Sequence, residues 1–78
     1  MGSESIRTGT VIKKFAKSGY GFIKDDDDEN YKDLFYHASE VVDPIFDDLK
    51  IGTAVNYLIK AGPKGTMAIS IVAIPDKQ

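Results

Sequence analysis

The chain contains no cysteine, no tryptophan and only one histidine among its 78 residues. The lack of cysteine excludes disulfides and thiolate metal sites, and one histidine is too few for an imidazole zinc site. No apolar run approaches the roughly 20 residues that cross a bilayer, and the N-terminus lacks the basic and apolar regions of a signal peptide. We therefore expect a cytoplasmic protein with no membrane partner, no metal and no cofactor.

Catalytic groups are also scarce. No serine, cysteine or second acid is placed to form a triad with His37, so the sequence predicts no enzyme and no small-molecule substrate. The length suits one small domain, which we place at residues 7–76. Residues 1–6 are mostly small and polar and predict a disordered tail. We expect a monomer.

The net charge of −2 is unevenly spread along the chain. Residues 1–24 carry +4, residues 25–48 carry −9, and residues 49–78 carry +3. The charge near a binding face matters more than the total. The middle segment is therefore acidic, whereas the first third of the chain is locally basic.

The most informative stretch is Ser18–Ile23, in which Tyr20 and Phe22 are separated by a glycine. In a strand the two aromatic side chains share one face, and Ile23 points to the other. A second segment, residues 34–37, places Phe35 and His37 on one face in the same way. If the two strands pair, four rings lie side by side, and bases stack on such rings at roughly 1–3 kcal/mol each.

Alternating and β-branched patterns predict five strands, at residues 11–15, 20–24, 31–37, 53–60 and 66–74. Residues 25–30 are expected to form an exposed loop, because their like charges would repel in a sheet. Ser39 is expected to cap a helical turn at residues 40–42, which Pro44 ends. Residues 43–52 read as a loop and residues 61–65 as a turn. Five short strands without a long helix predict an all-β fold, closed into a small antiparallel barrel.

The two aromatic segments, with Gly9 before them and Lys64-Gly65 after them, resemble the bacterial cold-shock domain family over about residues 7–74. The resemblance implies a five-stranded barrel of the oligonucleotide-binding (OB) fold. It also implies that Tyr20, Phe22 and Phe35 stack bases, with His37 on the same face and Lys64 reaching a phosphate backbone. The alternative is that these aromatics form the core, but Ile23, Leu34 and Tyr36 lie on the opposite face and can fill it.

The first strand departs from the family pattern, which usually has Lys-Trp-Phe there. Keeping the family spacing puts Lys13 at the tryptophan position and Lys14 at the phenylalanine position. A one-residue slip instead puts Phe15 at the phenylalanine position, and both alignments stay open. Ala38 stands where bacterial members commonly carry phenylalanine. Phe46 matches a loop aromatic that folds over a base, but it can equally anchor the loop to the barrel.

The resemblance implies binding of single-stranded RNA or DNA, as an RNA chaperone or a regulator of transcription or translation under stress. Because two stacking rings are missing, we expect weaker and more salt-sensitive binding than in a typical member, unless Lys13, Lys14 and Phe15 compensate. The rival hypothesis is a small barrel kept for protein interaction. The acidic net charge and the missing rings favour that rival, and the intact aromatic segments oppose it.

Overall fold

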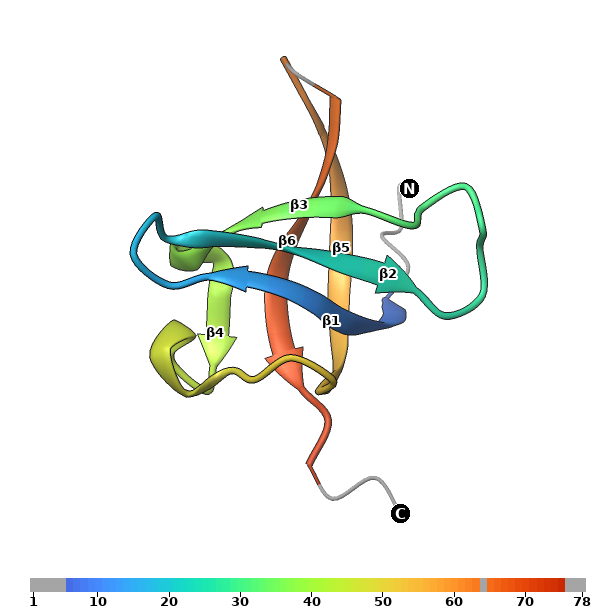
Figure 1. Cartoon of the computed structure of the whole chain (residues 1–78). Helices are drawn as coiled ribbons and strands as arrows, with labels where there is room; N and C mark the ends of the chain where they lie inside the picture. The colour runs from blue at the N-terminus through green and yellow to red at the C-terminus, as the bar shows by residue number, and fades with distance from the viewer. Residues whose placement is uncertain (1–5, 64, 76–78) are drawn as a thin grey trace.

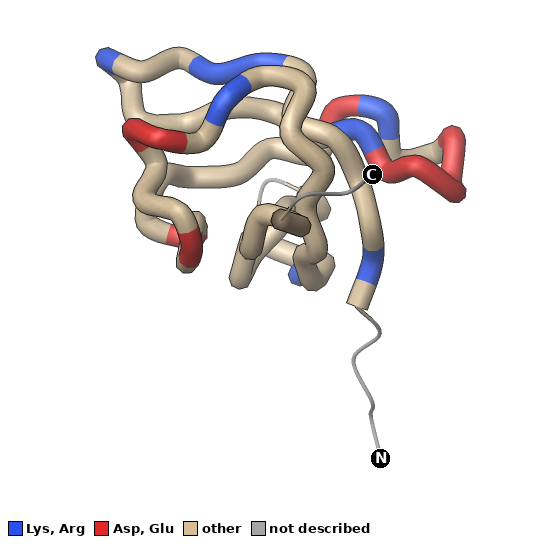
Figure 2. The backbone as a smooth tube through the Cα atoms, turned by 90° about the horizontal axis from the view of Figure 1, so that it is seen from below, with Lys and Arg blue, Asp and Glu red and all other residues tan. Residues whose placement is uncertain are grey.

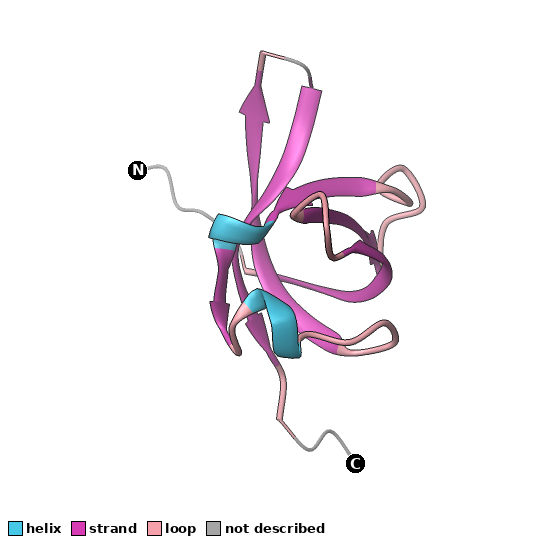
Figure 3. Cartoon of the chain, turned by 60° about the vertical axis from the view of Figure 1, so that its left-hand side comes forward, coloured by secondary structure: helices cyan, strands magenta, loops and turns pink. Residues whose placement is uncertain are grey.

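The computed structural model describes residues 6–63 and 65–75. The strands are β1 (Arg7–Phe15), β2 (Tyr20–Asp25), β3 (Leu34–His37), β4 (Val41–Asp43), β5 (Ala54–Gly62) and β6 (Gly65–Ala73). Two short 3-10 helices, η1 (Ala38–Glu40) and η2 (Phe46–Asp48), flank β4 (Figure 3). No helix within the described ranges is long and apolar enough to cross a membrane. Lys64 and the first five residues of the expected tail lie outside the described residues.

The strands close into a barrel (Figure 1). β1 pairs antiparallel with β2 and β5, β2 pairs with β3, and β5 pairs with β6. A parallel contact between β3 and β6, at Phe35 and Met67, completes the closure. The all-β, five-stranded OB-fold prediction is therefore confirmed. The short β4, which was not predicted, adds to β6 in parallel.

The barrel interior is filled by apolar side chains from all six strands and the loop before β5. Ile23, Leu34 and Tyr36 are buried in it, as the alternation predicted. The other buried members are Val11, Val41, Leu49, Val55, Tyr57, Ala68 and Ile71. Because these residues occupy the core, their strand neighbours on β2 and β3 face outward.

Glycine at two positions allows β1 and β2 to form a tight hairpin. Gly19 has φ +76° in the turn, a conformation that side chains other than glycine rarely adopt. A Cβ atom at Gly21 would collide with the Lys13 carbonyl and with the Tyr36 hydroxyl group. The glycine between Tyr20 and Phe22 therefore makes room for Tyr36 beneath the strand.

The prediction of an exposed loop over residues 25–30 is wrong for Asp25. Asp25 ends β2 and is only 2% exposed. Its carboxylate accepts hydrogen bonds from Arg7 and Tyr57 and from the backbone of Asp27 and Asp28. These donors compensate for the burial of the charge, and they hold the start of the loop against the barrel.

Two strands begin well away from their predicted first residues. β1 begins at Arg7 instead of Val11, because residues 7–10 pair with β5. β3 begins at Leu34, because the backbone of Tyr31 is hydrogen-bonded within the loop, to Asp25 and Asp28.

The expected helical turn at residues 40–42 is also wrong. The 3-10 helix lies earlier, at Ala38–Glu40, and His37 caps it in place of Ser39. Val41 and Val42 belong to β4, where Val41 is buried and pairs with Ile71 on β6. Burial of Val41 in the core outweighs the local capping signal.

Candidate functional site

Five aromatic side chains share the outer face of β1, β2 and β3. We call this surface the ring face, and its members are Phe15, Tyr20, Phe22, Phe35 and His37. Antiparallel pairing places Tyr20 opposite His37 and Phe22 opposite Phe35, so the predicted pairing of the two aromatic segments is confirmed. Phe15 on β1 lies opposite Tyr20. Phe15 and His37 are exposed, whereas the three central rings are half-buried.

The rings of the ring face contact one another. The Tyr20 ring centroid lies 5.5 Å from that of Phe35 and 6.0 Å from that of Phe22. The Phe22 and Phe35 centroids are 6.2 Å apart. These are the spacings of edge-to-face and tilted aromatic pairs, so the rings support one another and form a continuous apolar surface.

A bulge in β1 determines which residue of the Lys13–Phe15 segment joins the ring face. The register between β1 and β2 shifts between Val11 and Lys13. Beyond the shift, Lys13 pairs with Phe22 and Phe15 pairs with Tyr20, so both point outward. The Phe15 ring lies 5.0 Å from Tyr20 and 6.3 Å from Phe22. The segment thus contributes one ring and one lysine to this face.

Lys14 points away from the ring face and contacts the loop before β5. Its Nζ donates hydrogen bonds to the carbonyls of Asp47 and Leu49, each at 2.9 Å. The same ammonium lies 5.0 Å from the centroid of the Phe46 ring, a cation–π distance. Phe46 in turn packs edge-on against Tyr36, at 6.2 Å. Phe46 and Lys14 together fasten the loop to the barrel and lie apart from the five rings.

His37 is held by the residue two positions after it. The Ser39 backbone N–H donates to Nδ1 at 3.1 Å, and the Ser39 hydroxyl group lies 2.9 Å from the same nitrogen. Because Nδ1 accepts, the proton of the neutral ring lies on Nε2. The Nε2–H group is therefore the donor that His37 can offer to a ligand.

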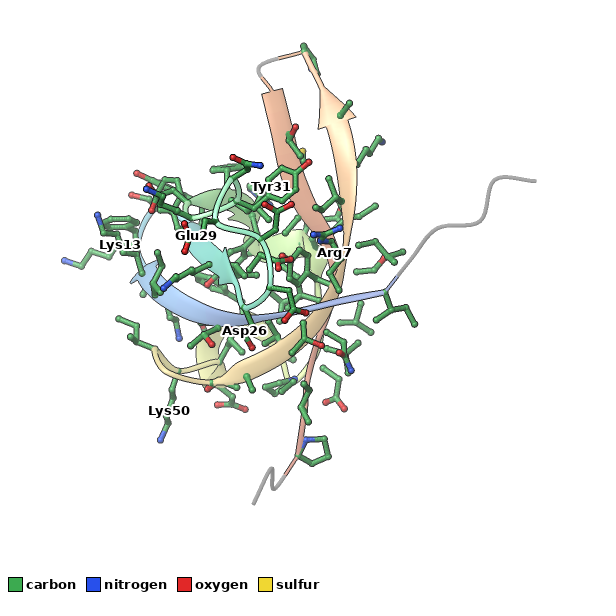
Figure 4. The ribbon with its side chains drawn as sticks, turned by 90° about the vertical axis from the view of Figure 1, so that its right-hand side faces the viewer. Arg7, Lys13, Asp26, Glu29, Tyr31 and Lys50 are labelled. Carbon is green, nitrogen blue, oxygen red and sulfur yellow. The ribbon has the colours of Figure 1, made fainter. Side chains whose placement is uncertain are left out.

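Charge is unevenly placed around the barrel. Lys13 is exposed beside the ring face and extends outward from β1 (Figure 4). Acidic residues gather in the loop between β2 and β3, on the right in Figures 1 and 2. A phosphate backbone on the ring face would therefore meet attraction near Lys13 and repulsion near that loop.

Arg7 and Asp25 fasten the start of β1 to the same loop. Arg7 Nε lies 2.8 Å from Asp25 Oδ2, and Arg7 Nη2 lies 3.5 Å from an oxygen of Asp28. The guanidinium also lies over the Tyr31 ring, with Cζ 5.2 Å from the ring centroid. Both residues are labelled in Figure 4. Burial by itself raises the pKa of Asp25, but hydrogen bonds from Tyr57 and Arg7 outweigh it and leave the pKa below its ordinary value. Burial, and then the bond to Asp25, raises the pKa of Tyr57.

Two residues that contact the site were not predicted to do so from the sequence. Met67 lies beside Phe35, which only the parallel pairing of β3 and β6 reveals. Ser39 was named only as a cap, not as the partner of His37. Within residues 6–63 and 65–75, no group of three or more histidine, cysteine or acidic side chains is placed to hold a metal ion.

Comparisons with known proteins identify the family. The family model described as the "'Cold-shock' DNA-binding domain" matches residues 7–74. The chain is 36% identical over 70 residues to cold shock-like protein CspD of Vibrio cholerae, covering 90% of each protein. It is 38% identical over 66 residues to cold shock-like protein CspA of Bordetella pertussis, covering 85% of this chain and 96% of that one.

Two longer proteins match over part of their length. Cold shock protein 1 of Arabidopsis thaliana is 39% identical over 72 residues, which are 91% of this chain and 23% of the plant protein. The solved structure "drosophila Unr CSD456" superposes with a TM-score of 0.78 at 24% identity, covering 97% of this chain and 29% of that one. The second likeness concerns the fold alone. With the family model spanning both aromatic segments, the chain belongs to the cold-shock domain family, whose members bind nucleic acids and have no enzymatic activity.

Proposed function

We propose that this chain binds single-stranded RNA or DNA by stacking bases on the ring face, with little sequence specificity. The observation that carries the proposal is the contact between Tyr20, Phe22 and Phe35, three aromatic rings that remain partly exposed on the outside of the barrel. An apolar surface of this kind suits the faces of bases, which are available in a single strand and covered in a duplex.

Each remaining site residue has a role in the proposal. Phe15 extends the row of rings at the β1 edge, and His37 stacks or donates from Nε2. Lys13 contacts a phosphate group, and Lys64 is proposed to do the same. Lys14 and Phe46 are proposed to act on the loop conformation, since the Lys14 ammonium is already bonded to two carbonyls.

The ring face has fewer rings than the family pattern, because Lys13 and Ala38 replace aromatic residues. Each stacked base is worth roughly 1–3 kcal/mol, so two missing rings weaken binding substantially. Phe15 compensates for part of this loss, and Lys13 adds a salt-dependent contribution. We propose a weak, salt-sensitive binder.

A protein that holds single strands competes with RNA base pairing without any chemical step. This supports a role as an RNA chaperone, or as a regulator of transcription or translation. We propose that the chain acts in the cytoplasm and as a monomer. The stress response is proposed from the family alone.

The test is a titration with a labelled pyrimidine-rich single strand at two salt concentrations, with the matching duplex as control. Saturable binding to the strand and not to the duplex, weaker at high salt, is the expected result. If no binding occurs even at low salt, the proposal fails and the protein-interaction barrel takes its place.

A further inference from the structure

Met67 is the one methionine among the residues that the structure describes, and the chain contains no cysteine and no tryptophan. It lies on β6, where it pairs with Phe35 of β3 and with Lys60 of β5. The next residue, Ala68, is completely buried in the core, so Met67 points to the outside of the barrel. Met67 is partly exposed. Its thioether is therefore the sulfur that a small reagent meets on the described surface.

Met67 adjoins the ring face at Phe35. Both residues line a hollow of about 460 Å³, where the β5–β6 hairpin extends past β3 at the top of Figure 1. The Phe35 ring also contacts Tyr20 and Phe22, whose centroids lie 5.5 and 6.2 Å away. A chemical change at Met67 is therefore made next to one of the three central rings.

Glycine leaves the Met67 sulfur uncovered on one side. A Cβ atom at Gly62 would lie 3.7 Å from the sulfur, in van der Waals contact with it. Gly62 has no such atom and itself lines the hollow. A molecule as small as hydrogen peroxide can therefore approach the thioether from the hollow without any strand of the barrel moving.

Thioethers react with peroxide by transfer of one oxygen atom. The sulfur attacks one oxygen of hydrogen peroxide, a sulfur–oxygen bond forms, the oxygen–oxygen bond breaks, and water leaves. Sulfur loses two electrons and the peroxide gains them, so the products are methionine sulfoxide and water. Because the chain has no thiol and no indole, neither group competes for the oxidant. Methionine sulfoxide reductases reverse the change.

A sulfoxide at position 67 changes the surface beside Phe35. It replaces an apolar thioether, which packs favourably against aromatic rings, with a polar group that binds water. A base stacked at Phe35 must then displace that water or lie farther from the ring. The core is not affected, because Ala68 and not Met67 faces it. The expected result is weaker binding by a barrel that remains folded.

We propose that Met67 is an oxidation site, at which peroxide forms methionine sulfoxide and thereby weakens single-strand binding on the ring face. The inference rests on the function proposed above and adds reversible control by an oxidant to it. The energies of contacts between thioether sulfur and aromatic rings correspond to a weakening of roughly two- to tenfold.

The experiment measures the affinity for a labelled single strand before and after treatment with hydrogen peroxide, under conditions that oxidise free methionine completely. Mass spectrometry of peptides locates the added oxygen atom, and thermal unfolding checks the fold. Met67→Leu keeps the apolar volume and removes the sulfur. Met67→Gln places a polar group at the same position without oxidant. Val72→Gln is its matched control, because Val72 is exposed on the same strand but does not line the hollow.

In the wild type we expect oxidation at Met67 and a loss of affinity of roughly two- to tenfold, with cooperative unfolding retained. Treatment with a methionine sulfoxide reductase should restore the affinity. Met67→Leu should keep its affinity through the peroxide treatment. Untreated Met67→Gln should bind about as weakly as the oxidised wild type, and Val72→Gln should bind as tightly as the untreated wild type.

Other results overturn the inference. If Met67 stays unoxidised in the folded chain, or if its sulfoxide leaves the affinity unchanged, the oxidation site is excluded and the proposed function stands. An equal loss in Met67→Leu would assign the effect to another group. An oxidised chain that no longer unfolds cooperatively would assign it to loss of the fold. If the untreated wild type binds no strand, the proposed function fails and takes the inference with it.

Discussion

Phe15 on β1 lies opposite Tyr20 on β2, with the two ring centroids 5.0 Å apart. This contact places a fourth phenylalanine or tyrosine ring beside the three on β2 and β3. Phe15 is 41% exposed, so little stability depends on it, and its ring is available to a ligand. It replaces part of the stacking surface that Lys13 and Ala38 do not supply.

The first prediction concerns that ring. Phe15→Ala should weaken single-strand binding roughly 5- to 150-fold, the equivalent of one stacked base, and should change the unfolding temperature little. Fluorescence anisotropy with a labelled strand and thermal unfolding measure the two effects. Val42→Ala, which removes an apolar side chain on β4 that is even more exposed, at 64%, should leave the affinity unchanged. Equal losses in both variants would contradict the role of Phe15.

The two adjacent lysines should behave differently, because they point in different directions. Lys13→Ala should reduce the slope of log affinity against log salt by about 0.7, the value for one phosphate contact on a single strand. Lys14→Ala should leave that slope unchanged and lower the stability, because it removes the hydrogen bonds to Asp47 and Leu49. Measuring affinity at four salt concentrations separates them. A reduced slope in Lys14→Ala alone would reverse the assignment.

Two buried tyrosines form a matched pair for stability. Among the described residues, the Tyr36 hydroxyl group is the buried side-chain polar atom without a hydrogen-bond partner, whereas the Tyr57 hydroxyl donates to Asp25. Tyr36→Phe should be neutral or stabilising by up to about 1 kcal/mol, because it removes an uncompensated desolvation cost. Tyr57→Phe should destabilise by roughly 1–2 kcal/mol. Urea unfolding gives both values, and the opposite order would contradict the assignment of these hydroxyl groups.

Asp25 should make the fold sensitive to acid. Its pKa in the folded chain lies below the ordinary 3.8, because the bonds from Tyr57 and Arg7 outweigh the effect of burial. As the pH falls, Asp25 therefore takes up a proton in the unfolded chain before it does so in the folded chain. The stability that Asp25 contributes is complete above pH 3.8 and is lost as the pH falls through the pKa of the folded chain.

The comparison variant for this effect is Asp25→Asn. It should be less stable at neutral pH by roughly 1–3 kcal/mol, and its stability should fall less steeply in acid than that of the wild type. Thermal unfolding from neutral pH down to strong acid tests this. Parallel curves for the two proteins would show that Asp25 does not contribute.

Most strands of the barrel could be predicted, because apolar and polar residues alternate along them. Tyr20 and Phe22 stand at alternate positions of the strand, and Ile23, the next residue, points to the opposite side. The prediction that the two rings face outward and Ile23 faces the core is confirmed. The bulge between Val11 and Lys13 could not be predicted, because a register shift depends on how two strands pair and is not visible in the residue types of one strand. That bulge decides whether Lys14 or Phe15 joins the rings.

The other differences arise from contacts distant in sequence. Asp25 reads as part of an acidic loop, and only the approach of Arg7 and Tyr57 explains its burial. Met67 comes to lie beside Phe35 only through the parallel contact between β3 and β6, which joins residues 32 positions apart. Ser39 is a residue type that commonly caps a helix, but Val41, two residues later, is buried in the core and belongs to a strand.

The most direct test of stacking uses the four tyrosines of the chain. Only Tyr20 belongs to the ring face, whereas Tyr36 and Tyr57 are buried and Tyr31 lies under Arg7. With ring-labelled tyrosine, a saturating single strand should shift the Tyr20 ring signals strongly, because a stacked base lies over them, and should leave the other three nearly unchanged. A Tyr20 signal that stays in place while the strand is bound would contradict stacking on the ring face.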